Sequence, residues 1–247
     1  MNADDSALIW QENGKRVLLK TPVFTVTETD SVASDGQKGN YMVIEPGHDW
    51  AIVIPVHGSK FLMVKQWRHA ECVLSIEFPG GVMDEGETPE QAAARELLEE
   101  TGHTAGRLTY LGTMSPNPAL MSNHVHFFAA EDLTNIHEQH LDKDEYVHYL
   151  ELDQQEVIDG LGSKKEYSHA LMAAAVALYQ RLRALQPAPY AALAWHPADG
   201  HTLCLSPELF LARDGDRLHT LPMKGTARAT GDIEAAKAAL ARDPKNR

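Results

Sequence analysis

Three glutamates crowded into one turn of an expected helix restrict this chain more than any other feature. Glu96, Glu99 and Glu100 directly follow Arg95 within residues 81–102, GVMDEGETPEQAAARELLEETG. Because an α-helix turns about 100° per residue, the three carboxylates share one side of the helix. Like charges at this spacing repel each other, so folding alone gives no reason to gather them. A divalent cation would turn that repulsion into attraction.

The same helix has a recognisable start, end and apolar side. Thr88 is a suitable N-cap, and Gln91 completes a Thr-x-x-Gln capping box. Pro89 suits the first helical position, and Gly102 is a typical stop signal. Before the helix, residues 77–81 (EFPGG) read as a strand end turning into a glycine-rich loop, whose carbonyls can approach the glutamates. The helix side opposite the glutamates is expected to pack on a core and carries Ala94, Leu97, Leu98 and Thr101.

These residues form a longer pattern that resembles a known family signature. Gly81, five residues, Glu87, seven residues and then RELxEExG at residues 95–102 resemble the box of the Nudix hydrolases. His103 departs from it, because the family usually has an apolar residue there. A plain solvated acidic helix, the ordinary alternative, would need neither the fixed glycines nor the arginine. Over about residues 15–185 the resemblance implies an α+β chain: a Nudix α/β/α sandwich with a mixed sheet and an N-terminal antiparallel strand layer.

The ligand types indicate the chemistry of such a site. Clustered carboxylates and a loop carbonyl offer only oxygen ligands, which favours Mg²⁺ or Mn²⁺ over zinc or copper. These ions bind diphosphates, neutralise charge that develops on phosphate oxygens and lower the pKa of a bound water. The expected reaction is therefore hydrolysis of a diphosphate.

The resemblance also assigns roles within the box. It implies that Glu96 and Glu100 are the main metal ligands and that Glu99 is a supporting ligand or a base. The Gly80 carbonyl would be a further ligand. Arg95 would orient the glutamates, although an ordinary helix ion pair explains it equally well.

The segment before the box indicates the subgroup. Gln66, Trp67 and Arg68, followed by Glu77, resemble an element of the ADP-ribose diphosphatases. The resemblance implies that Arg68 contacts phosphate or ribose and that Glu77 accepts a hydrogen bond from the substrate or from Arg68. Trp67 would stack on a base, although a half-buried strand aromatic is the commoner fate of such a residue. The expected substrate is ADP-ribose or a related nucleotide sugar, giving AMP and a sugar phosphate.

The proline-rich loop after the box is where this family places substrate loops. Asn117 and Asn123 are candidate substrate contacts there, although asparagine also dominates plain turns. Many ADP-ribose diphosphatases have a Pro-Gly pair where this chain has Pro118-Ala119, which leaves the substrate's identity open. His124 and His126 share one strand face, and we expect them to be surface polar residues.

A second acidic run, DKDE at residues 142–145, follows this strand. In the resembling subgroup the general base comes from a mobile loop in this region, which makes Glu145 the candidate. A solvated charge run before a strand explains Glu145 at least as well.

Composition excludes several protein classes. The chain has 247 residues, a formal net charge of -13 and only two cysteines, Cys72 and Cys204. No apolar run is long enough to span a bilayer, and MNADDSALIW lacks the order of a signal peptide, so we expect a cytoplasmic protein. The negative charge argues against nonspecific nucleic-acid binding. We expect a small-molecule nucleotide partner, no nucleic acid, no membrane and, by resemblance, a homodimer.

Three parts are expected along the chain. Residues 1–50 would form the N-terminal layer, with strands near 17–20, 23–29 and 42–45 and a turn at 31–40. Residues 51–185 would form the Nudix hydrolase domain, closed by a helix at 167–185. The break QPAP opens the third part, residues 186–247.

The third part resembles a different family. LCLSPELFL at residues 203–211 and LPMKGTAR at residues 221–228 resemble the chorismate-using enzymes, close to aminodeoxychorismate synthase component I. The family's catalytic lysine maps onto Lys224. The resemblance covers about the last quarter of the chain and stops before the family's other active-site half. We therefore expect a partial, β-rich and non-functional appendage, a gene-fusion remnant or an effect of the chain boundary; an incidental β-hairpin is the alternative.

Two other functions stay open. The chain could be a catalytically silent Nudix-fold nucleotide-binding protein, although a pure binder has no need for three crowded carboxylates. It could also be a chorismate-metabolism fusion, although the downstream half of that active site is absent from the sequence.

Overall fold

The computed structural model describes residues 5–136, 138–141, 143 and 145–185, together with four strand segments further along, 190–196, 200–206, 212–214 and 217–219. The chain divides into two compact units, Met1–Leu182 and Arg183–Arg247. Among the described residues no helix is both long and apolar enough to cross a membrane.

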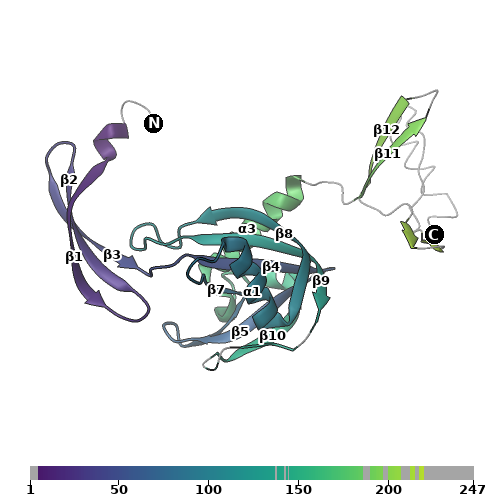
Figure 1. Ribbon diagram of the computed structural model, residues 1–247, viewed down its shortest axis with the longest axis horizontal. Helices are drawn as coiled ribbons and strands as arrows, with labels where there is room; N and C mark the ends of the chain where they lie inside the picture. Colours follow the sequence, from purple (N-terminus) through teal and green to yellow (C-terminus); the bar gives the residue numbers. More distant parts are fainter. Residues whose placement is uncertain are drawn as a thin grey trace. The chain divides into compact units, whose positions relative to one another are not determined.

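The first unit begins with a small antiparallel sheet, which confirms the expected N-terminal strand layer (Figure 1). A 3-10 turn, Asp5–Leu8, leads into β1 (Trp10–Lys20), β2 (Thr25–Ala33) and β3 (Lys38–Glu45), in the order β1-β2-β3. The strands are longer than the sequence predicts, because the Gly/Ser/Asp-rich region is mostly strand and the turn is confined to residues 34–37.

A seven-stranded mixed sheet forms the centre of this unit. Its strands are β4 (Trp50–His57), β5 (Lys60–Arg68), β6 (Val73–Glu77), β7 (Gly80–Val82), β8 (His103–Met114), β9 (Val125–Asn135) and β10 (Val147–Asp153). The main order is β10-β5-β4-β9-β8, with β6 paired to β5 and β7 paired to β4. The β4–β9 pair is parallel and its neighbours are antiparallel, so the sheet is mixed as expected.

Helices cover both faces of this sheet. They are α1 (Pro89–Thr101), α2 (Gln154–Gly160) and α3 (Ala170–Leu185), with a 3-10 turn at Lys165–Tyr167. Ala51 and Val53 of β4 pack with α1, whereas Ile52 and Ile54 pack with α3. Since successive strand residues point to opposite faces, α1 and α3 lie on opposite sides of the sheet, which confirms the α/β/α sandwich. The closing helix begins at Ala170 rather than at residue 167.

The ends of α1 match the local signals. Thr88 accepts a hydrogen bond from the Gln91 amide, the reciprocal capping-box bond is present, and Gly102 adopts a left-handed conformation with φ 72°. The predicted division into an acidic and an apolar side was wrong in part. Ala94 is exposed, whereas Glu96 and Glu100 are buried alongside Leu97. The reason is that the glutamates face the loop before the helix rather than solvent.

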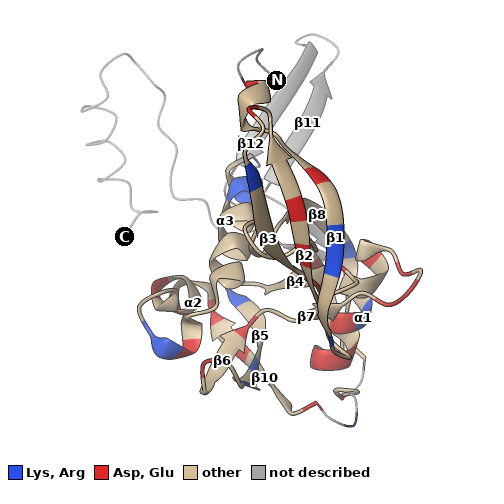
Figure 2. Ribbon diagram, turned by 90° about the vertical axis from the view of Figure 1, so that its left-hand side faces the viewer, with Lys and Arg blue, Asp and Glu red and all other residues tan. Residues whose placement is uncertain are grey.

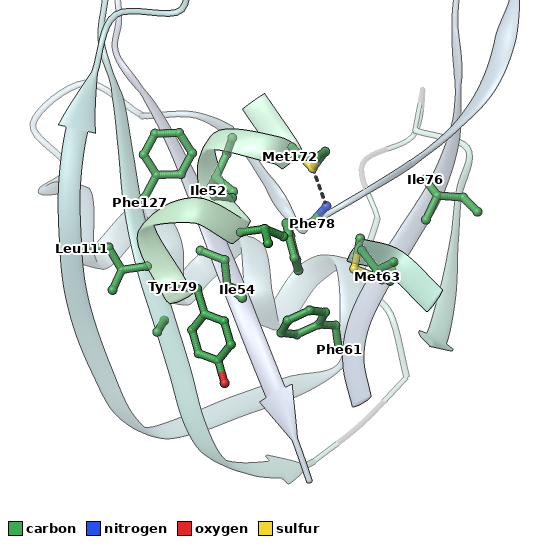
Figure 3. Close-up of a cluster of buried hydrophobic side chains, with 14 of the residues drawn as sticks. Ile52, Ile54, Phe61, Met63, Ile76, Phe78, Leu111, Phe127, Met172 and Tyr179 are labelled. Atoms are coloured by element: carbon green, nitrogen blue, oxygen red, sulfur yellow. Dashed lines mark hydrogen bonds between the residues drawn. The ribbon is translucent and has the colours of Figure 1, made fainter. Parts of the chain in front are cut away.

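The core on the α3 side reaches the strand end that precedes the glycine loop (Figure 3). Phe61 packs edge to face against Phe78, with ring centroids 5.2 Å apart, and against Tyr179, at 5.5 Å. The backbone N–H of Phe78 donates a 2.9 Å hydrogen bond to Sδ of Met172 in α3. Helix α3 is therefore hydrogen-bonded to the residue that directly follows β6, where the chain enters the glycine loop.

Beyond the end of α3 at Leu185, the described residues of the second unit are all in strands. β11 (Tyr190–His196) pairs with β12 (Gly200–Ser206), and β13 (Ala212–Asp214) pairs with β14 (Arg217–His219), both antiparallel. This agrees with the expected β-rich appendage. Lys224 lies outside the described residues.

Candidate functional site

Two glycines allow the loop to lie against β4 and α1. A Cβ atom on Gly80 would stand 2.3 Å from the Ala51 carbonyl oxygen, and a Cβ on Gly81 would stand 2.5 Å from Oε1 of Glu96. Real Cβ atoms essentially never come that close to another heavy atom. The glycines thus leave open the space that the helix carboxylates occupy.

Glu96 and Glu100 are buried carboxylates beside this loop. Glu96 is 7% exposed and Glu100 is 4% exposed. Oε2 of Glu100 accepts a 2.9 Å hydrogen bond from the N–H of Gly80. The pKa of Glu100 is raised to about 8, chiefly by burial and also by the charges of Glu96 and Glu145, although the hydrogen bond from Gly80 lowers it. Burial likewise raises the pKa of Glu96 to about 7, which Arg95 only partly offsets.

Arg95 joins the acidic residues around it. Its Nε and Nη2 atoms donate to both carboxylate oxygens of Glu87, each at 3.0 Å, and Nη2 also donates to the Val82 carbonyl at 3.1 Å. Its Nη1 atom donates to Oε1 of Glu96 at 2.9 Å and to Oε2 of Glu99 at 3.0 Å. Arg95 therefore makes the ordinary i,i+4 ion pair and, in addition, holds the glutamates against the loop (Figure 2 shows the acidic residues on α1 in red).

These groups can be tested for their fit to a divalent cation. Within the described ranges, no three His, Cys, Asp or Glu side chains are arranged so that they could hold a metal ion by themselves. Glu96 and Glu100 nevertheless supply two buried carboxylates next to a loop that only glycine can form. Mg²⁺ commonly uses one or two carboxylates and takes its other ligands from water and substrate phosphates. The donor set fits such an ion.

Glu145 lies close enough to this cluster for its charge to raise the pKa values of Glu96 and Glu100. Its side chain is exposed, just before β10. The preceding segment is tied to the end of α1, because the His140 amide donates to the Glu99 carbonyl at 2.9 Å and the Gln139 side chain donates to the Glu100 carbonyl at 2.6 Å. The structure thus brings Glu145 towards the box.

A cavity of about 870 Å³ adjoins the glycine loop. Its walls come from residues 22–24 beside the N-terminal layer, from the start of β4, from Gly80 and Gly81 and from the first turn of α3. Most of the lining side chains are apolar, and Arg68, Glu77 and His169 are among the polar ones. A mostly apolar hollow with a few polar groups is the usual form of a small-molecule site.

Arg68 and Glu77 form an ion pair in this cavity, in which Glu77 is buried and the Arg68 side chain is 45% exposed. Nε of Arg68 donates to Oε1 of Glu77 at 2.7 Å, and Nη2 donates to Oε2 at 2.5 Å. Glu77 is 2% exposed. Burial alone would raise the pKa of Glu77, but Arg68 and His169 outweigh burial and hold the pKa well below its usual range. The expected contact between Arg68 and Glu77 is therefore present.

Three of the candidate substrate contacts, Trp67, Asn117 and Asn123, do not line this cavity. Trp67 is adjacent to Arg68 on β5 and lies edge to face with His69, at a centroid distance of 6.5 Å. Since neighbouring strand residues point to opposite faces, Trp67 cannot share the wall that Arg68 forms. Oδ1 of Asn117 accepts a 3.2 Å hydrogen bond from the Ala119 amide, which is a turn contact.

The loop histidines also lie away from the cavity. His126 contacts Oδ2 of Asp49 at 3.0 Å and Oγ1 of Thr113 at 2.7 Å. The His124 amide donates to Oδ1 of Asp49 at 2.7 Å. Asn123 is buried, and its side-chain amide has no hydrogen-bond partner within the part of the chain that is described.

Sequence reasoning missed two parts of the cavity wall, residues 22–24 and the turn around His169. No motif marks either of them. Residues 22–24 join β1 to β2, and His169 directly precedes α3. Both reach the cavity through the tertiary arrangement of these elements, for which a single sequence carries no local signal.

Comparisons with known proteins agree with this geometry. The NUDIX domain model matches residues 47–171, and the model of chorismate binding enzymes matches residues 138–247. The two matches share residues 138–171, so the second begins earlier than the resemblance at residues 186–247 suggests. In the structure Val157 and Tyr167 of this shared stretch belong to the core under α3.

Several relatives cover much of the first unit. An ADP-ribose pyrophosphatase of Bacillus subtilis is 32% identical over 179 residues, which is 70% of this chain and 96% of the relative. The ADP compounds hydrolase NudE of Escherichia coli is 29% identical over 115 residues, 46% of this chain and 62% of the relative. A crystal structure of an ADP compounds hydrolase matches in fold, with a TM-score of 0.64, 22% identity and coverage of 72% of this chain and 95% of that one. Together with the box geometry around Arg95 and Glu100, these matches show that the chain belongs to the NUDIX family.

Proposed function

We propose that the protein hydrolyses the diphosphate bond of a nucleoside diphosphate linked to another moiety, with ADP-ribose or a related nucleotide sugar as substrate and AMP and a sugar phosphate as products. The observation that carries the proposal is the cavity of about 870 Å³ that ends on Gly80 and Gly81, against which the buried carboxylates of α1 are held. The names of the relatives from Bacillus subtilis and Escherichia coli support the same substrate class.

Roles within the box follow from burial and contacts. Glu96, Glu100 and the Gly80 carbonyl would hold Mg²⁺ or Mn²⁺, with Glu99 as a supporting ligand. When bound, such an ion neutralises charge on the phosphate oxygens and acidifies a water. Arg95 orients the glutamates, since it donates to Glu96 and Glu99 at once. A cation would also offset the burial that now raises the pKa values of Glu96 and Glu100.

Glu145 is the proposed general base. Its negative charge raises the pKa values of both buried glutamates, which supports a position within electrostatic range of the proposed metal site. Removal of a proton from that water by Glu145 would complete the attack on phosphorus. On the cavity side, Arg68 would bind phosphate or ribose, with Glu77 fixing the direction of its guanidinium.

We also propose a homodimer that forms through the N-terminal layer. β1 is an edge strand of eleven residues, ten of them exposed. Trp10, Val17, Leu18 and Leu19 are among its exposed side chains. An edge strand of this length with apolar side chains favours pairing with a second chain. Light scattering after gel filtration measures the mass directly, and a mass of about 27 kDa, that of a single chain, would contradict the dimer.

We also propose the limits of the domains and the location of the protein. We propose a strand layer at residues 1–50, the hydrolase domain at 51–185 and a non-functional segment at 186–247. Two cysteines in 247 residues form no disulfide framework, which favours the reducing cytoplasm.

One plate assay tests the function. The protein is incubated with ADP-ribose, ADP-glucose and NADH, each with and without Mg²⁺, and AMP is measured. Metal-dependent AMP release supports the proposal. If binding is detected but no substrate is cleaved with either Mg²⁺ or Mn²⁺, the protein is a nucleotide-binding member of the family instead. Chorismate consumption with ammonia would favour the chorismate-metabolism fusion, a hypothesis that is based on the match at residues 138–247.

A further inference from the structure

The residues at the start of α3 and just before it form one wall of the cavity. None of them belongs to the box, and none was expected to be a site residue. Ser168, His169, Leu171 and Met172 line the cavity, together with Arg68 and Glu77. In the sequence this turn lies about ninety residues beyond Glu77. Among these four residues, His169 has the side chain best suited to bind a polar group of a ligand.

Two hydrogen bonds fix this turn to β6 and to the turn before it. Sδ of Met172 accepts the 2.9 Å bond from the Phe78 amide (Figure 3), and the Ser168 hydroxyl donates to Oε2 of Glu71 at 2.6 Å. Phe78 directly follows Glu77, and Met172 is 1% exposed. The position of His169 relative to Glu77 is therefore set by the buried core and not by a free loop.

The two nitrogens of His169 have different surroundings. Nδ1 lies 3.0 Å from Oε2 of Glu77, although it is not aligned as a full hydrogen bond, and it is shielded from solvent. The side chain as a whole is 35% exposed, so its exposed surface belongs to the atoms other than Nδ1, the part of the side chain that includes Nε2. Over the described ranges, Nε2 has no hydrogen-bond partner in the protein.

Glu77 also sets the chemical form of this ring. A carboxylate beside Nδ1 favours the tautomer with its hydrogen on Nδ1, which leaves the lone pair on Nε2 in the neutral ring. Arg68 is held in a similar way, because Nε and Nη2 are used on Glu77 while Nη1 has no partner among the described residues. Glu77 thus presents an acceptor, Nε2 of His169, and a donor, Nη1 of Arg68, to the cavity.

We propose that His169 is a substrate-binding residue whose Nε2 atom accepts a hydrogen bond from a ribose hydroxyl of the substrate. This inference rests on the proposed function, since it assumes that a nucleotide sugar occupies the cavity. A ribose hydroxyl donates to Nε2 and can accept from Nη1 of Arg68, so the pair would recognise the sugar and not only the phosphate charge. The hydroxyl belongs either to the nucleoside ribose or to the distal sugar.

The test compares two variants, each of which keeps a polar group near the position of only one of the two imidazole nitrogens. His169→Asn keeps an amide near the position of Nδ1, where it can still contact Glu77, but it removes the cavity-facing nitrogen. His169→Gln places an amide near the position of Nε2 and can still accept from a hydroxyl. The probes are α,β-methylene ADP-ribose and α,β-methylene ADP, which resist hydrolysis, and their affinities are measured by calorimetry with Mg²⁺ present.

We expect His169→Asn to bind α,β-methylene ADP-ribose about five- to tenfold more weakly than the unmodified protein, as for the loss of one hydrogen bond, and His169→Gln to lose less than half of that factor. An equal loss for α,β-methylene ADP would assign the hydroxyl to the nucleoside ribose. A loss confined to α,β-methylene ADP-ribose would assign it to the distal sugar. Thermal unfolding of each variant shows whether it is folded.

The opposite results would overturn the inference. His169→Asn binding as well as the unmodified protein, or both variants losing affinity equally, would leave His169 with only its contact to Glu77. His57→Asn, at an exposed histidine that does not line the cavity, is the matched control and should bind normally. If the unmodified protein bound neither analogue and released no AMP from ADP-ribose, the proposed function itself would fail, and the inference with it.

Discussion

The N–H of Gly80 donates a 2.9 Å hydrogen bond to Oε2 of Glu100, twenty residues further along the chain. This bond joins the loop after β6 to the last turn of α1. It also fixes one oxygen of a carboxylate that is 4% exposed. The second oxygen, Oε1, does not take part in this bond. Because the loop backbone holds Oε2, it also sets the orientation of Oε1.

Replacement of this carboxylate tests the proposed metal site. Glu100→Gln removes a negative ligand but almost no volume, so we expect kcat/KM with Mg²⁺ to fall by at least about 100-fold while the melting temperature stays within a few degrees of the original. Turnover is measured with ADP-ribose over a range of Mg²⁺ concentrations. Glu90→Gln, at an exposed residue of the same helix, is the control and should keep full activity. Near-normal turnover of Glu100→Gln at saturating Mg²⁺ would remove Glu100 from the ligands.

A single methyl group on the loop tests the close approach of Glu96. In Gly81→Ala the new Cβ would stand 2.5 Å from Oε1 of Glu96, so that carboxylate must move. We expect activity to fall at least about tenfold and the apparent affinity for Mg²⁺ to fall with it, because Arg95 and the loop no longer hold Glu96 in place. Gly86→Ala in the following turn, where a Cβ would meet nothing within 4 Å but φ is +81°, is the control for backbone strain alone. Gly81 has no left-handed φ, so Gly81→Ala adds the contact with Glu96 without that strain, and normal activity in Gly81→Ala would contradict the role of this contact.

The pKa values of Glu96 and Glu100 predict how stability depends on pH in EDTA. Burial raises them to about 7 and about 8, above the value near 4.3 of an unfolded glutamate, so the native state binds these protons more tightly. Their contribution is complete below about pH 4.3 and is lost as pH rises through about 7 to 8. We therefore expect the melting temperature in EDTA to fall between pH 5.5 and pH 9.

Mg²⁺ should change that dependence, because the ion binds the ionised carboxylates. The rise in melting temperature on adding Mg²⁺ should be larger at pH 8.5 than at pH 5.5. Differential scanning fluorimetry at both pH values measures it, with Glu100→Gln as the variant in which the difference shrinks. A stabilisation by Mg²⁺ that is the same at both pH values would contradict the assignment of these glutamates.

Local chemistry made α1 and its neighbours predictable, and tertiary contacts made the rest unpredictable. The capping box at Thr88 and the stop at Gly102 act within a few residues, so they could be found in the sequence alone. The burial of Glu96 could not, because it depends on β7 lying against the helix. For Trp67 a signal was present: strand alternation places Trp67 and Arg68 on opposite faces, so the two could not share one cavity wall.

His169 illustrates the limit more sharply. Nothing around it resembles a motif, and its importance comes from a 3.0 Å approach to Glu77 that α3 brings about. The two residues are separated by β7, α1, β8, β9, β10, α2 and the 3-10 turn at Lys165–Tyr167. The contact of Met172 with Phe78 and the hydrogen bond from Ser168 to Glu71 bring them together.

Removal of the second unit tests the proposal that it has no role in hydrolysis. A chain that ends at Leu185 keeps α3 and every described wall of the cavity. We expect kcat and KM to stay within about twofold and the melting temperature of the first unit to stay within a few degrees, since every described residue of the core under α3 lies at or before Leu182. Loss of activity with an unchanged melting temperature would show that the second unit contributes to the site.

The general base is tested at Glu145. Glu145→Gln keeps the size of the side chain but removes its proton affinity, so we expect kcat to fall by about 10²–10⁴ while KM changes little, because Glu145 does not line the cavity. The charge of Glu145 also raises the pKa of Glu100, so Glu145→Gln removes a negative charge that acts on the proposed metal site. At pH 9, where Glu100 is ionised in either protein, this variant should therefore bind Mg²⁺ no more tightly than the unmodified protein. Glu85→Gln, at an exposed residue before α1, is the control and should leave kcat unchanged. A normal kcat in Glu145→Gln would return this residue to an ordinary exposed charge before β10, and the proton of the attacking water would then have to pass to Glu99, the one glutamate of the box that is 39% exposed.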